Sequence, residues 1–378
     1  MADANSRRLL GGRTTAAFVH RYWHKDALLV RCAIPDFSAF ISRNGLFALA
    51  ARDDVSSRLV QRVRGRYTLV EGPFRISELR RLPARNWTLL VQGVNLHSDA
   101  ADTLLRRFAF IPFARLDDLM VSCAAPGGGV GPHADSYDVF LLQTLGRRRW
   151  RYGRQDDPRL RPAAPLKILA RFTPQHDETL VPGDMLYLPP DFAHDGIALD
   201  ECITCSIGFR APLHQVLAEA FLDHLRDAID VPGRYADPDL RPTRAAAHID
   251  AKMRRRVART IAQIRWKPED VSRFLGRYLT EPKPEVVFRP ARRATREQFR
   301  RRILRDGVRL DRRAQLLYDD AHYYLNGEDA SLPATDRAEL RRLADRRALT
   351  PKECAALSTQ MIDLLHDWHR HGFLADAA

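Results

Sequence analysis

Residues 126–140 read PGGGVGPHADSYDVF and place His133 and Asp135 two positions apart, directly after a glycine-rich loop. Successive side chains of a β-strand point to opposite faces, so two residues at this spacing share one face. If the pair lies on a strand, one imidazole and one carboxylate can converge on a common point. Because an HxD pair arises by chance in many chains, it predicts a metal site only together with a third ligand.

A third candidate ligand follows in residues 181–194, VPGDMLYLPPDFAH. The segment reads as a tight turn, a short strand, a proline turn and then His194, which we expect at the mouth of a strand. The spacing G-x5-P-x4-H after an HxD pair is typical of a cupin-type double-stranded β-helix. Two imidazoles and one carboxylate leave three coordination positions open, which suits Fe(II) that binds both a co-substrate and O2. The alternative is that all three are ordinary surface side chains.

Arg148 follows Asp135 within residues 146–150, GRRRW. On a strand, alternation sends Arg148 to one face and Arg147 and Arg149 to the other. An arginine that points inward beside an iron site can bind a carboxylate through two parallel hydrogen bonds. The distal carboxylate of 2-oxoglutarate is such a group. The alternative is a solvated basic strand.

Composition excludes several classes of protein. The chain has 378 residues, of which 45% are hydrophobic and 29% charged, and its mean hydropathy is −0.36. These values describe a globular chain of two or three domains and exclude one that is mostly disordered or collagen-like. No stretch approaches the roughly 18 uncharged apolar residues of a membrane span. Residues 1–14 contain no apolar run of signal-peptide length, so we expect a cytoplasmic protein.

The pattern of apolar residues divides the chain into three parts. Between residues 66 and 209, short β-type runs alternate with glycine, proline and aspartate, which predicts a β-sandwich or barrel. On either side the apolar spacing is more helical. We expect helices over 36–64, 213–230, 248–279, 336–346 and 351–370, and a hairpin between 316–318 and 322–325.

The formal net charge of +14 is concentrated in one segment. Residues 251–314 contain 21 Lys and Arg but only 7 Asp and Glu, so this block accounts for the whole excess. Basic blocks of this kind often contact phosphate-rich partners, which points to nucleic acid or to the ribosome. The alternative is a general richness in arginine, since runs of arginine also occur elsewhere in the chain.

The five cysteines are sparse and odd in number. Cys202 and Cys205 form a lone CxxC inside an apolar run, without a second CxxC to complete a zinc site. We expect two thiols packed on a strand; a redox pair or half of a zinc site is the alternative. The set does not describe a secreted, disulfide-stapled protein.

Three runs carry a resemblance to a known family. They are SCAAPGGGVGPHADSYDVFLLQTLGRRRWRYG, PGDMLYLPPDFAHDG and SIGFRAP, and the match is densest over 86–212. The chain resembles the bacterial ribosomal oxygenases, which are JmjC-type hydroxylases acting on arginine in a large-subunit ribosomal protein. The resemblance implies an α+β fold: a double-stranded β-helix (cupin/JmjC jelly roll) with N-terminal helices over 1–211, a helical dimerisation region over 212–281, and a winged-helix-like domain over 282–378.

The resemblance also assigns roles to residues. It implies Fe(II) as the metal, with 2-oxoglutarate and O2 as co-substrates. Matching positions are His133, Asp135 and His194 for iron, and Arg148 and Ser122 for 2-oxoglutarate. A weaker inference from position and chemistry places Asp118 and Tyr137 around the incoming guanidinium, with Asp117 and Asp138 as further acidic groups near the motif. The chain departs from the general cupin pattern at Asp191, where glycine is usual.

The implied activity is hydroxylation of the β-carbon of an arginine in a large-subunit ribosomal protein. A histidine hydroxylase and a demethylase remain open, because the triad alone does not separate these reactions. A third alternative is a DNA-binding regulator that uses the basic 251–314 block and the winged-helix-like tail, with the β-domain as a metal sensor. The family implies a homodimer, although the apolar stripes at 217–225 and 257–264 could equally belong to an intrachain core. The basic surface would then lie near ribosomal RNA or the target protein.

Overall fold

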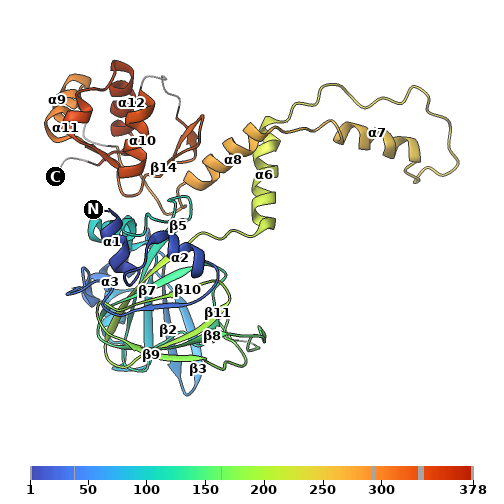
Figure 1. Ribbon diagram of the computed structural model, residues 1–378. Helices are drawn as coiled ribbons and strands as arrows, with labels where there is room; N and C mark the ends of the chain where they lie inside the picture. The colour runs from blue at the N-terminus through green and yellow to red at the C-terminus, as the bar shows by residue number, and fades with distance from the viewer. Residues whose placement is uncertain (1, 38, 163, 291–293, 331–335, 376–378) are drawn as a thin grey trace.

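The computed structural model describes residues 2–37, 39–162, 164–290, 294–330 and 336–375. Figure 1 shows three parts: a β-rich body that contains the N-terminus, a helical middle from which one helix extends far from the rest, and a C-terminal helical domain above the body. The expected α+β fold is confirmed.

Two sheets build the β-rich body. The larger one has the strand order β1-β10-β7-β12-β5-β4-β2-β3 and the smaller one has β6-β11-β8-β9. All pairings between described strands of these sheets are antiparallel. The strands are β1 (Leu28–Val30), β2 (Ser57–Val63), β3 (Arg66–Glu71), β4 (Trp87–Val91), β5 (Leu116–Ala124), β6 (His133–Ala134), β7 (Val139–Leu145), β8 (Arg148–Arg154), β9 (His176–Leu180), β10 (Met185–Leu188), β11 (Phe192–Ala198) and β12 (Cys202–Phe209).

Strand β7 shows why the larger sheet lies at the centre of the body. Val139 and Leu141 pack in a cluster with Trp150 of the smaller sheet, whereas Phe140 and Leu142 pack in the main core on the opposite face. A strand covered on both faces needs apolar residues at every position, which is what its sequence provides. The inner cluster places the two sheets face to face, as in a jelly roll.

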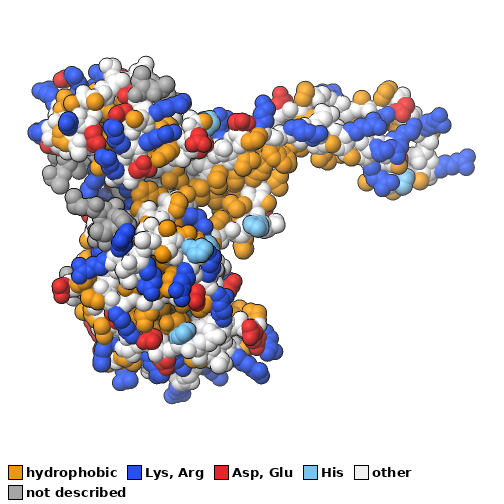
Figure 2. Space-filling view, viewed as in Figure 1, with side chains coloured by type: hydrophobic (Ala, Val, Ile, Leu, Met, Phe, Trp, Pro, Cys, Tyr) orange, Lys and Arg blue, Asp and Glu red, His pale blue; other side chains and the backbone are white. Residues whose placement is uncertain are grey.

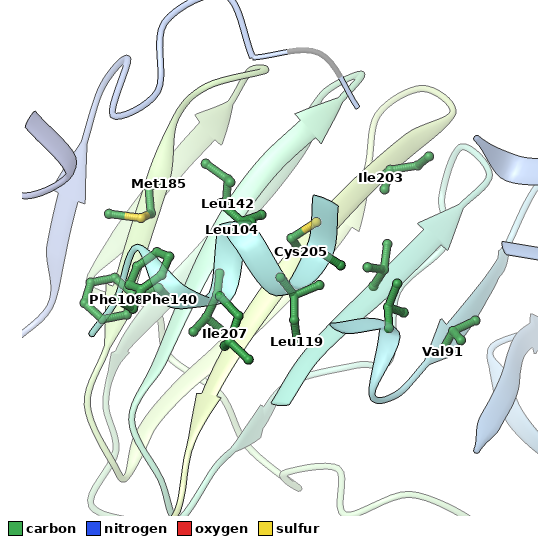
Figure 3. Packing of buried hydrophobic residues seen from close by; sticks show 14 of the residues in the cluster. Val91, Leu104, Phe108, Leu119, Phe140, Leu142, Met185, Ile203, Cys205 and Ile207 are labelled. Atoms are coloured by element: carbon green, nitrogen blue, oxygen red, sulfur yellow. The ribbon is translucent and has the colours of Figure 1, made fainter. Parts of the chain in front are cut away.

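Short helices cover the outer face of the larger sheet. They include α1 (Ala2–Leu9), α2 (Thr15–Arg21), α3 (Arg43–Ala50), α4 (Ile76–Arg80), the 3-10 turn η1 (Val94–Leu96) and α5 (Asp99–Arg106). Leu104 of α5 packs with Phe140 and Leu142 in the main core (Figure 3). Side-chain oxygens of Thr14, Ser42 and Ser98 cap three of these helices, which fixes where each begins.

The chain then forms α6 (His214–Ala228), α7 (Ala251–Ile261) and α8 (Pro268–Thr280). The C-terminal domain has its own core and contains α9 (Arg296–Asp306), β13 (Val308–Arg309), β14 (Leu316–Tyr318), β15 (Tyr323–Leu325), β16 (Glu328–Asp329), α10 (Arg337–Arg346), β17 (Ala348–Leu349), α11 (Pro351–Cys354) and α12 (Thr359–Arg370). Among the described residues, no helix has both the length and the apolar character needed to cross a bilayer.

Several secondary-structure predictions were wrong in part. The helix expected over 351–370 is two helices, α11 and α12, because Ser358 caps the start of the second. The helix expected over 36–64 ends at Ala50, and Ser57–Val63 instead forms β2, which is hydrogen bonded between β3 and β4. The helix expected over 248–279 is broken, since Pro268 begins α8 and cannot continue a preceding helix. Helix α9 was missed because its arginine-rich sequence buries only Phe299 and Ile303.

The glycine-rich loop before His133 joins the two sheets. Ala125 donates its N–H to the carbonyl of Trp87 on β4, and Gly127 donates to the carbonyl of Ala198 on β11. A Cβ at Gly128 would lie 2.1 Å from the carbonyl oxygen of Trp87, so the loop passes against β4 with no room for a side chain. This close passage leads the chain directly into the strand that carries His133.

We expect Gly128→Ala to destabilise the fold by about 1–3 kcal/mol, because the added methyl group meets backbone rather than a movable side chain. Gly208→Ala is the matched control: its Cβ would be 3.7 Å from the nearest atom, an ordinary contact. The free energy of unfolding, measured by chemical denaturation, tests both variants. Equal stabilities for the two variants would contradict this account of the loop.

Candidate active site

His133 and His194 lie directly opposite each other on the paired strands β6 and β11. Their ring centroids are 4.2 Å apart. Asp135 completes the group: its oxygens are 3.9 Å from Nε2 of His133 and 3.7 Å from Nε2 of His194. One ligand atom from each residue lies within 4.8 Å of the other two, a spacing that suits a single metal ion. His194 is inside β11, not at the mouth of a strand.

Backbone carbonyls fix the orientation of both imidazoles. Nδ1 of His133 lies 2.9 Å from the carbonyl oxygen of Gly131, and Nδ1 of His194 lies 3.0 Å from that of Phe192. Because a carbonyl can only accept, both Nδ1 atoms donate, which leaves both Nε2 lone pairs for a metal. Burial, reinforced by the neighbouring His133, lowers the pKa of His194 to about 4, so its ring is neutral near pH 7.

Asp191, the departure from the cupin pattern, occupies a turn with a positive φ of 64°. Its N–H donates to the carbonyl of Asp135, which ties the β10–β11 turn to the metal-site loop. Glycine is favoured in this left-handed conformation, but aspartate is one of the few residues that tolerate it. The departure therefore preserves the turn.

Arg148 points into the body from β8 and is only 4% exposed. Its Nη1 donates to Oγ of Ser122 at 3.1 Å, whereas its Nε and Nη2 are buried without a hydrogen-bond partner among the described residues. Arg147 and Arg149 instead face solvent and pair with Asp200 and Asp177. A buried guanidinium with two unpaired donors is costly unless an anion binds it, so this position fits a carboxylate ligand.

One cavity of about 530 Å³ is lined by all seven residues for which the sequence predicts a role in binding metal, co-substrate or substrate. They come from β5, β6, β8, β11 and the loop after β6, and they are Asp118, Ser122, His133, Asp135, Tyr137, Arg148 and His194. The triad and the arginine therefore face the same enclosed volume. A ligand that binds both at once needs a metal-binding end and a distal carboxylate.

Asp118 and Tyr137 form another wall of the cavity, on either side of Gly208. Burial raises the pKa of Asp118, while Lys283 lowers it. Burial and the nearby carboxylates of Asp135 and Asp118 also raise the pKa of the Tyr137 hydroxyl, so this group stays protonated. An acid beside a tyrosine in the wall of a cavity suits a cationic side chain.

Of the two further acidic groups, Asp117 lines the cavity but Asp138 does not belong to it. Asp138 is fully buried and accepts hydrogen bonds from the hydroxyl of Tyr187 at 2.5 Å and the backbone N–H of His24. It serves the packing of the N-terminal segment. Its proximity in sequence to the HxD pair was misleading because the chain bends at residues 136 and 137, between β6 and β7.

Sequence reasoning missed other residues that line the cavity, among them Arg58 and Trp150. Arg58 lies on β2, the strand mistaken for helix, and its Nε is buried without a hydrogen-bond partner among the described residues. The apolar residues of 57–63, at 59, 60 and 63, do not alternate, so the sequence carried no clear strand signal here. Trp150 has its ring centroid 5.8 Å from that of His194, and it has this room because its cross-strand neighbour is Gly196.

Cys202 and Cys205 do not form a paired site. Both are buried and free on β12, but Cys205 packs in the main core whereas Cys202 packs in a separate small cluster with Ala124 and Ala198. Residues three apart on a strand point to opposite faces. This arrangement excludes both a joint zinc site and a direct redox pair.

Comparisons with known proteins agree with this geometry. Residues 103–217 match the JmjC domain family, and residues 263–375 match the ROXA-like winged helix. The ribosomal protein uL16 3-hydroxylase of Escherichia coli is 34% identical over 88% of this chain and 89% of its own length. The X-ray structure of E. coli YcfD aligns with a TM-score of 0.82 at 31% identity, covering 95% of this chain and 97% of that one. YcfD in complex with cobalt and 2-oxoglutarate aligns with a TM-score of 0.78 at 30% identity, with coverage of 95% and 97%. The chain belongs to the JmjC-type ribosomal oxygenase family.

Proposed function

We propose that this chain is an Fe(II)- and 2-oxoglutarate-dependent oxygenase that hydroxylates the β-carbon of an arginine in the ribosomal protein uL16. The observation that carries the proposal is a three-ligand metal group sharing one cavity with a buried, partly unpaired Arg148. The names of the relatives support the substrate, and the solved complex of YcfD with cobalt and 2-oxoglutarate supports the co-substrate. We place the activity in the cytoplasm, where ribosomal proteins are made.

His133, Asp135 and His194 would hold the iron, through both Nε2 atoms and one carboxylate oxygen. When bound, iron with 2-oxoglutarate and O2 supplies the oxidising power that inserts an oxygen atom into a C–H bond. The protein supplies position: Arg148 and Ser122 hold the distal carboxylate of the co-substrate. His194 and Arg148 are buried, whereas His133 and Asp135 remain partly exposed on the side from which a substrate can enter.

The substrate arginine would enter on the side of Asp118 and Tyr137. Oδ1 of Asp118 faces the cavity next to Gly208, where it can accept hydrogen bonds from a guanidinium. A charge-assisted hydrogen bond between the largely buried carboxylate of Asp118 and a guanidinium would favour arginine over neutral and acidic side chains. Histidine hydroxylation and demethylation are the alternative reactions, and the chemical change found in the product peptide distinguishes them from arginine hydroxylation. No observation favours a DNA-binding regulator, which needs no carboxylate-binding arginine beside a metal group.

We also propose the domain division 1–211, 212–281 and 282–378, and a homodimer formed through the middle region. Helices α6, α7 and α8 expose apolar side chains such as Leu222 (63%) and Ile261 (61%), and Figure 2 shows an apolar patch over this region. Within the described structure α7 buries none of its residues. An isolated helix of 11 residues is barely stable in water, so a second copy of the chain is its natural support.

Helix α7 is also strongly basic on the side opposite its apolar stripe. Lys252, Arg255, Arg256 and Arg259 project at positions that helical periodicity places away from Met253, Val257 and Ile261. Figure 2 shows Lys and Arg side chains along this arm. If the apolar stripe packs on a partner subunit, the basic stripe faces outward. We propose that this surface lies near ribosomal RNA when the target protein is bound.

Mass spectrometry of a uL16 peptide, incubated with the protein, Fe(II), 2-oxoglutarate and O2, tests the activity. We expect the gain of one oxygen atom on an arginine and none with His194→Ala. His248→Ala, which changes an exposed histidine far from the site, is the matched control and should keep the activity. Modification of a histidine, or loss of a methyl group from a methylated peptide, would favour the corresponding alternative.

Replacing Arg148 tests the co-substrate site. We expect Arg148→Met to raise the KM for 2-oxoglutarate by about 10- to 100-fold, since hydrogen bonds to a charged group contribute roughly 1.5–3 kcal/mol. Without 2-oxoglutarate the variant should be at least as stable as the wild type, because an unpaired buried charge is removed. Arg149→Met, on the same strand but paired with Asp177 at the surface, is the control. An unchanged KM in Arg148→Met would refute the assignment.

The dimer is tested by measuring mass in solution. We expect the wild type at twice the chain mass of 43.1 kDa and the double variant Leu222→Asp/Ile261→Asp at the mass of one chain. Two buried carboxylates in an apolar interface cost far more than they do in water. Val63→Asp, at an exposed valine on β2, is the control. A wild type that remains a single chain at micromolar concentration would rule out the dimer.

A further inference from the structure

Lys283 connects the linker after α8 with the acidic end of β5. Its Nζ lies 3.0 Å from Oδ1 of Asp117 and 4.0 Å from Oδ2 of Asp118. Lys283 lies in a small cavity of its own with Leu96, Thr280 and Arg312, on the other side of these two carboxylates from the metal group. A residue 165 positions later in the chain thus contacts the wall where the substrate is expected to bind.

The two oxygens of Asp118 face different surroundings. Oδ2 accepts the backbone N–H of Gly93 at 2.9 Å and lies towards Lys283. Oδ1 is the atom nearest to a Cβ built on Gly208, at 3.7 Å, and it faces the cavity beside Tyr137. Oδ2 is therefore fixed by a hydrogen bond on the side away from the cavity, and Oδ1 is available to bind a ligand in the cavity.

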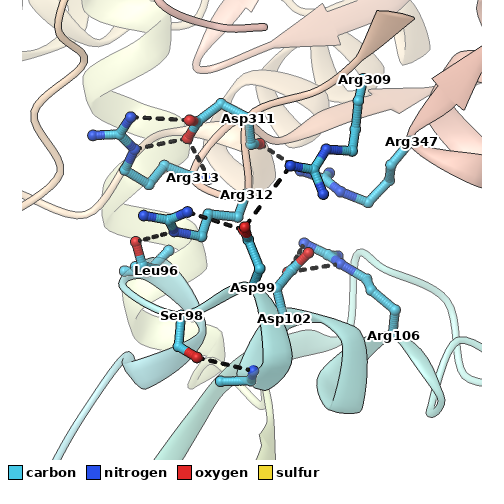
Figure 4. Close-up of polar contacts among 11 residues, drawn as sticks. Leu96, Ser98, Asp99, Asp102, Arg106, Arg309, Asp311, Arg312, Arg313 and Arg347 are labelled. Atoms are coloured by element: carbon cyan, nitrogen blue, oxygen red, sulfur yellow. Dashed lines mark hydrogen bonds and ion pairs between the residues drawn. The ribbon is translucent and has the colours of Figure 1, made fainter. Parts of the chain in front are cut away.

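The C-terminal domain also holds the turn that supplies the Gly93 N–H. Arg312 donates through Nε to the carbonyl of Leu96, at the end of η1, and through Nη1 to Asp99 at 3.0 Å (Figure 4). Within η1, Oδ1 of Asn95 accepts the N–H of Leu119, the residue after Asp118. The turn is thus fixed between β5 and the C-terminal domain.

We propose that the C-terminal domain and its linker position the substrate-binding carboxylate, with Lys283 acting directly on Asp117 and Asp118 and Arg312 acting through η1. This inference rests on the proposed function, since it concerns how that function selects a cationic side chain. Two adjacent carboxylates repel each other, and a lysine behind them offsets this repulsion without entering the cavity. Lys283 and Arg312 are positioning residues; neither touches the substrate.

The balance of charge around Asp118 gives the proposal a pH dependence. Burial raises the pKa of Asp118, and Lys283 and the Gly93 N–H lower it. Removing Lys283 therefore raises this pKa, so the carboxylate protonates at a higher pH and loses its hold on a cation there. The charged or titratable groups that face Asp118 or its neighbour Asp117 from the surrounding elements are Lys283, Asp117, Arg58, Tyr137 and Arg210.

The opposite reading makes Lys283 an internal competitor that occupies the acidic pair until the substrate displaces it. That reading predicts tighter peptide binding when Lys283 is removed, so the two readings differ in sign. The separate cavity of Lys283 and the cavity-facing Oδ1 of Asp118 favour support over competition.

The test compares Lys283→Met, Lys283→Arg and Arg312→Met with two controls in the same domain, Lys352→Met and Arg346→Met, which change an exposed lysine and an arginine paired within the domain. We expect Lys283→Met to raise the KM for the arginine peptide by about fivefold, the scale of a partly exposed ion pair. The kcat and the KM for 2-oxoglutarate should stay unchanged. Lys283→Arg should restore the peptide KM, and Arg312→Met should raise it in the same direction.

Two further readouts separate positioning from general damage. The acid limb of kcat/KM for the peptide should move to higher pH in Lys283→Met but not in Lys352→Met. Binding of a fluorescently labelled arginine peptide to the metal-free protein should weaken by the same factor, and this holds whether or not the wild type turns over. Thermal unfolding identifies a variant that fails to fold, in which case Lys283→Gln replaces Lys283→Met.

An unchanged or lower peptide KM in a folded Lys283→Met protein would overturn the inference while leaving the proposed function intact. If the wild type instead binds the peptide but modifies no arginine, the proposed function fails and the positioning role is judged on binding alone. Equal peptide binding by wild type and Lys283→Met refutes that role in either case.

Discussion

The pairing of β6 with β11 is the constraint on which the rest of the site depends. It places His133 directly opposite His194, and the two-residue spacing brings Asp135 to the same point. Neither strand could take this register freely, because the glycine-rich loop before β6 is hydrogen bonded to both sheets. A slip of one strand by one residue would turn its imidazole to the opposite face of the sheet and separate the two rings.

The chemistry follows from what the two sheets enclose. The inner faces enclose a cavity lined by both apolar and polar side chains, and the metal group and Arg148 belong to its polar part. Of the Arg148 nitrogens, the fold satisfies one through Ser122 and leaves two without a partner among the described residues. The unpaired buried guanidinium lowers the free energy of unfolding of the β-rich body. Binding of an anion pairs this charge and raises that free energy, so co-substrate binding stabilises the body.

Local patterns predicted much of the site but little of its surroundings. The triad and Arg148 could be predicted because their spacing follows strand alternation. The resemblance added Ser122, and position and chemistry suggested Asp118 and Tyr137. Arg58 was not predicted as a site residue because its segment was predicted as a helix. The spacing of apolar residues there is compatible with a helix as well as with a strand. Asp138 was misjudged because the bend between β6 and β7 directs it towards Tyr187 and His24 rather than into the cavity. Lys283 could not be found at all: its contact with Asp117 joins distant segments, and only the packing of the C-terminal domain creates it.

The absence of a side chain at Gly196 determines where the indole of Trp150 lies. A Cβ there would lie 2.6 Å from the indole of Trp150, so the glycine is what allows this ring to lie against His194. Indole emission is quenched by nearby ions with partly filled d shells, and energy passes from it to coloured complexes at short range. The enzyme thus carries its own optical reporter at the metal site, and the light emitted by one of its five tryptophans should record occupancy without any attached dye.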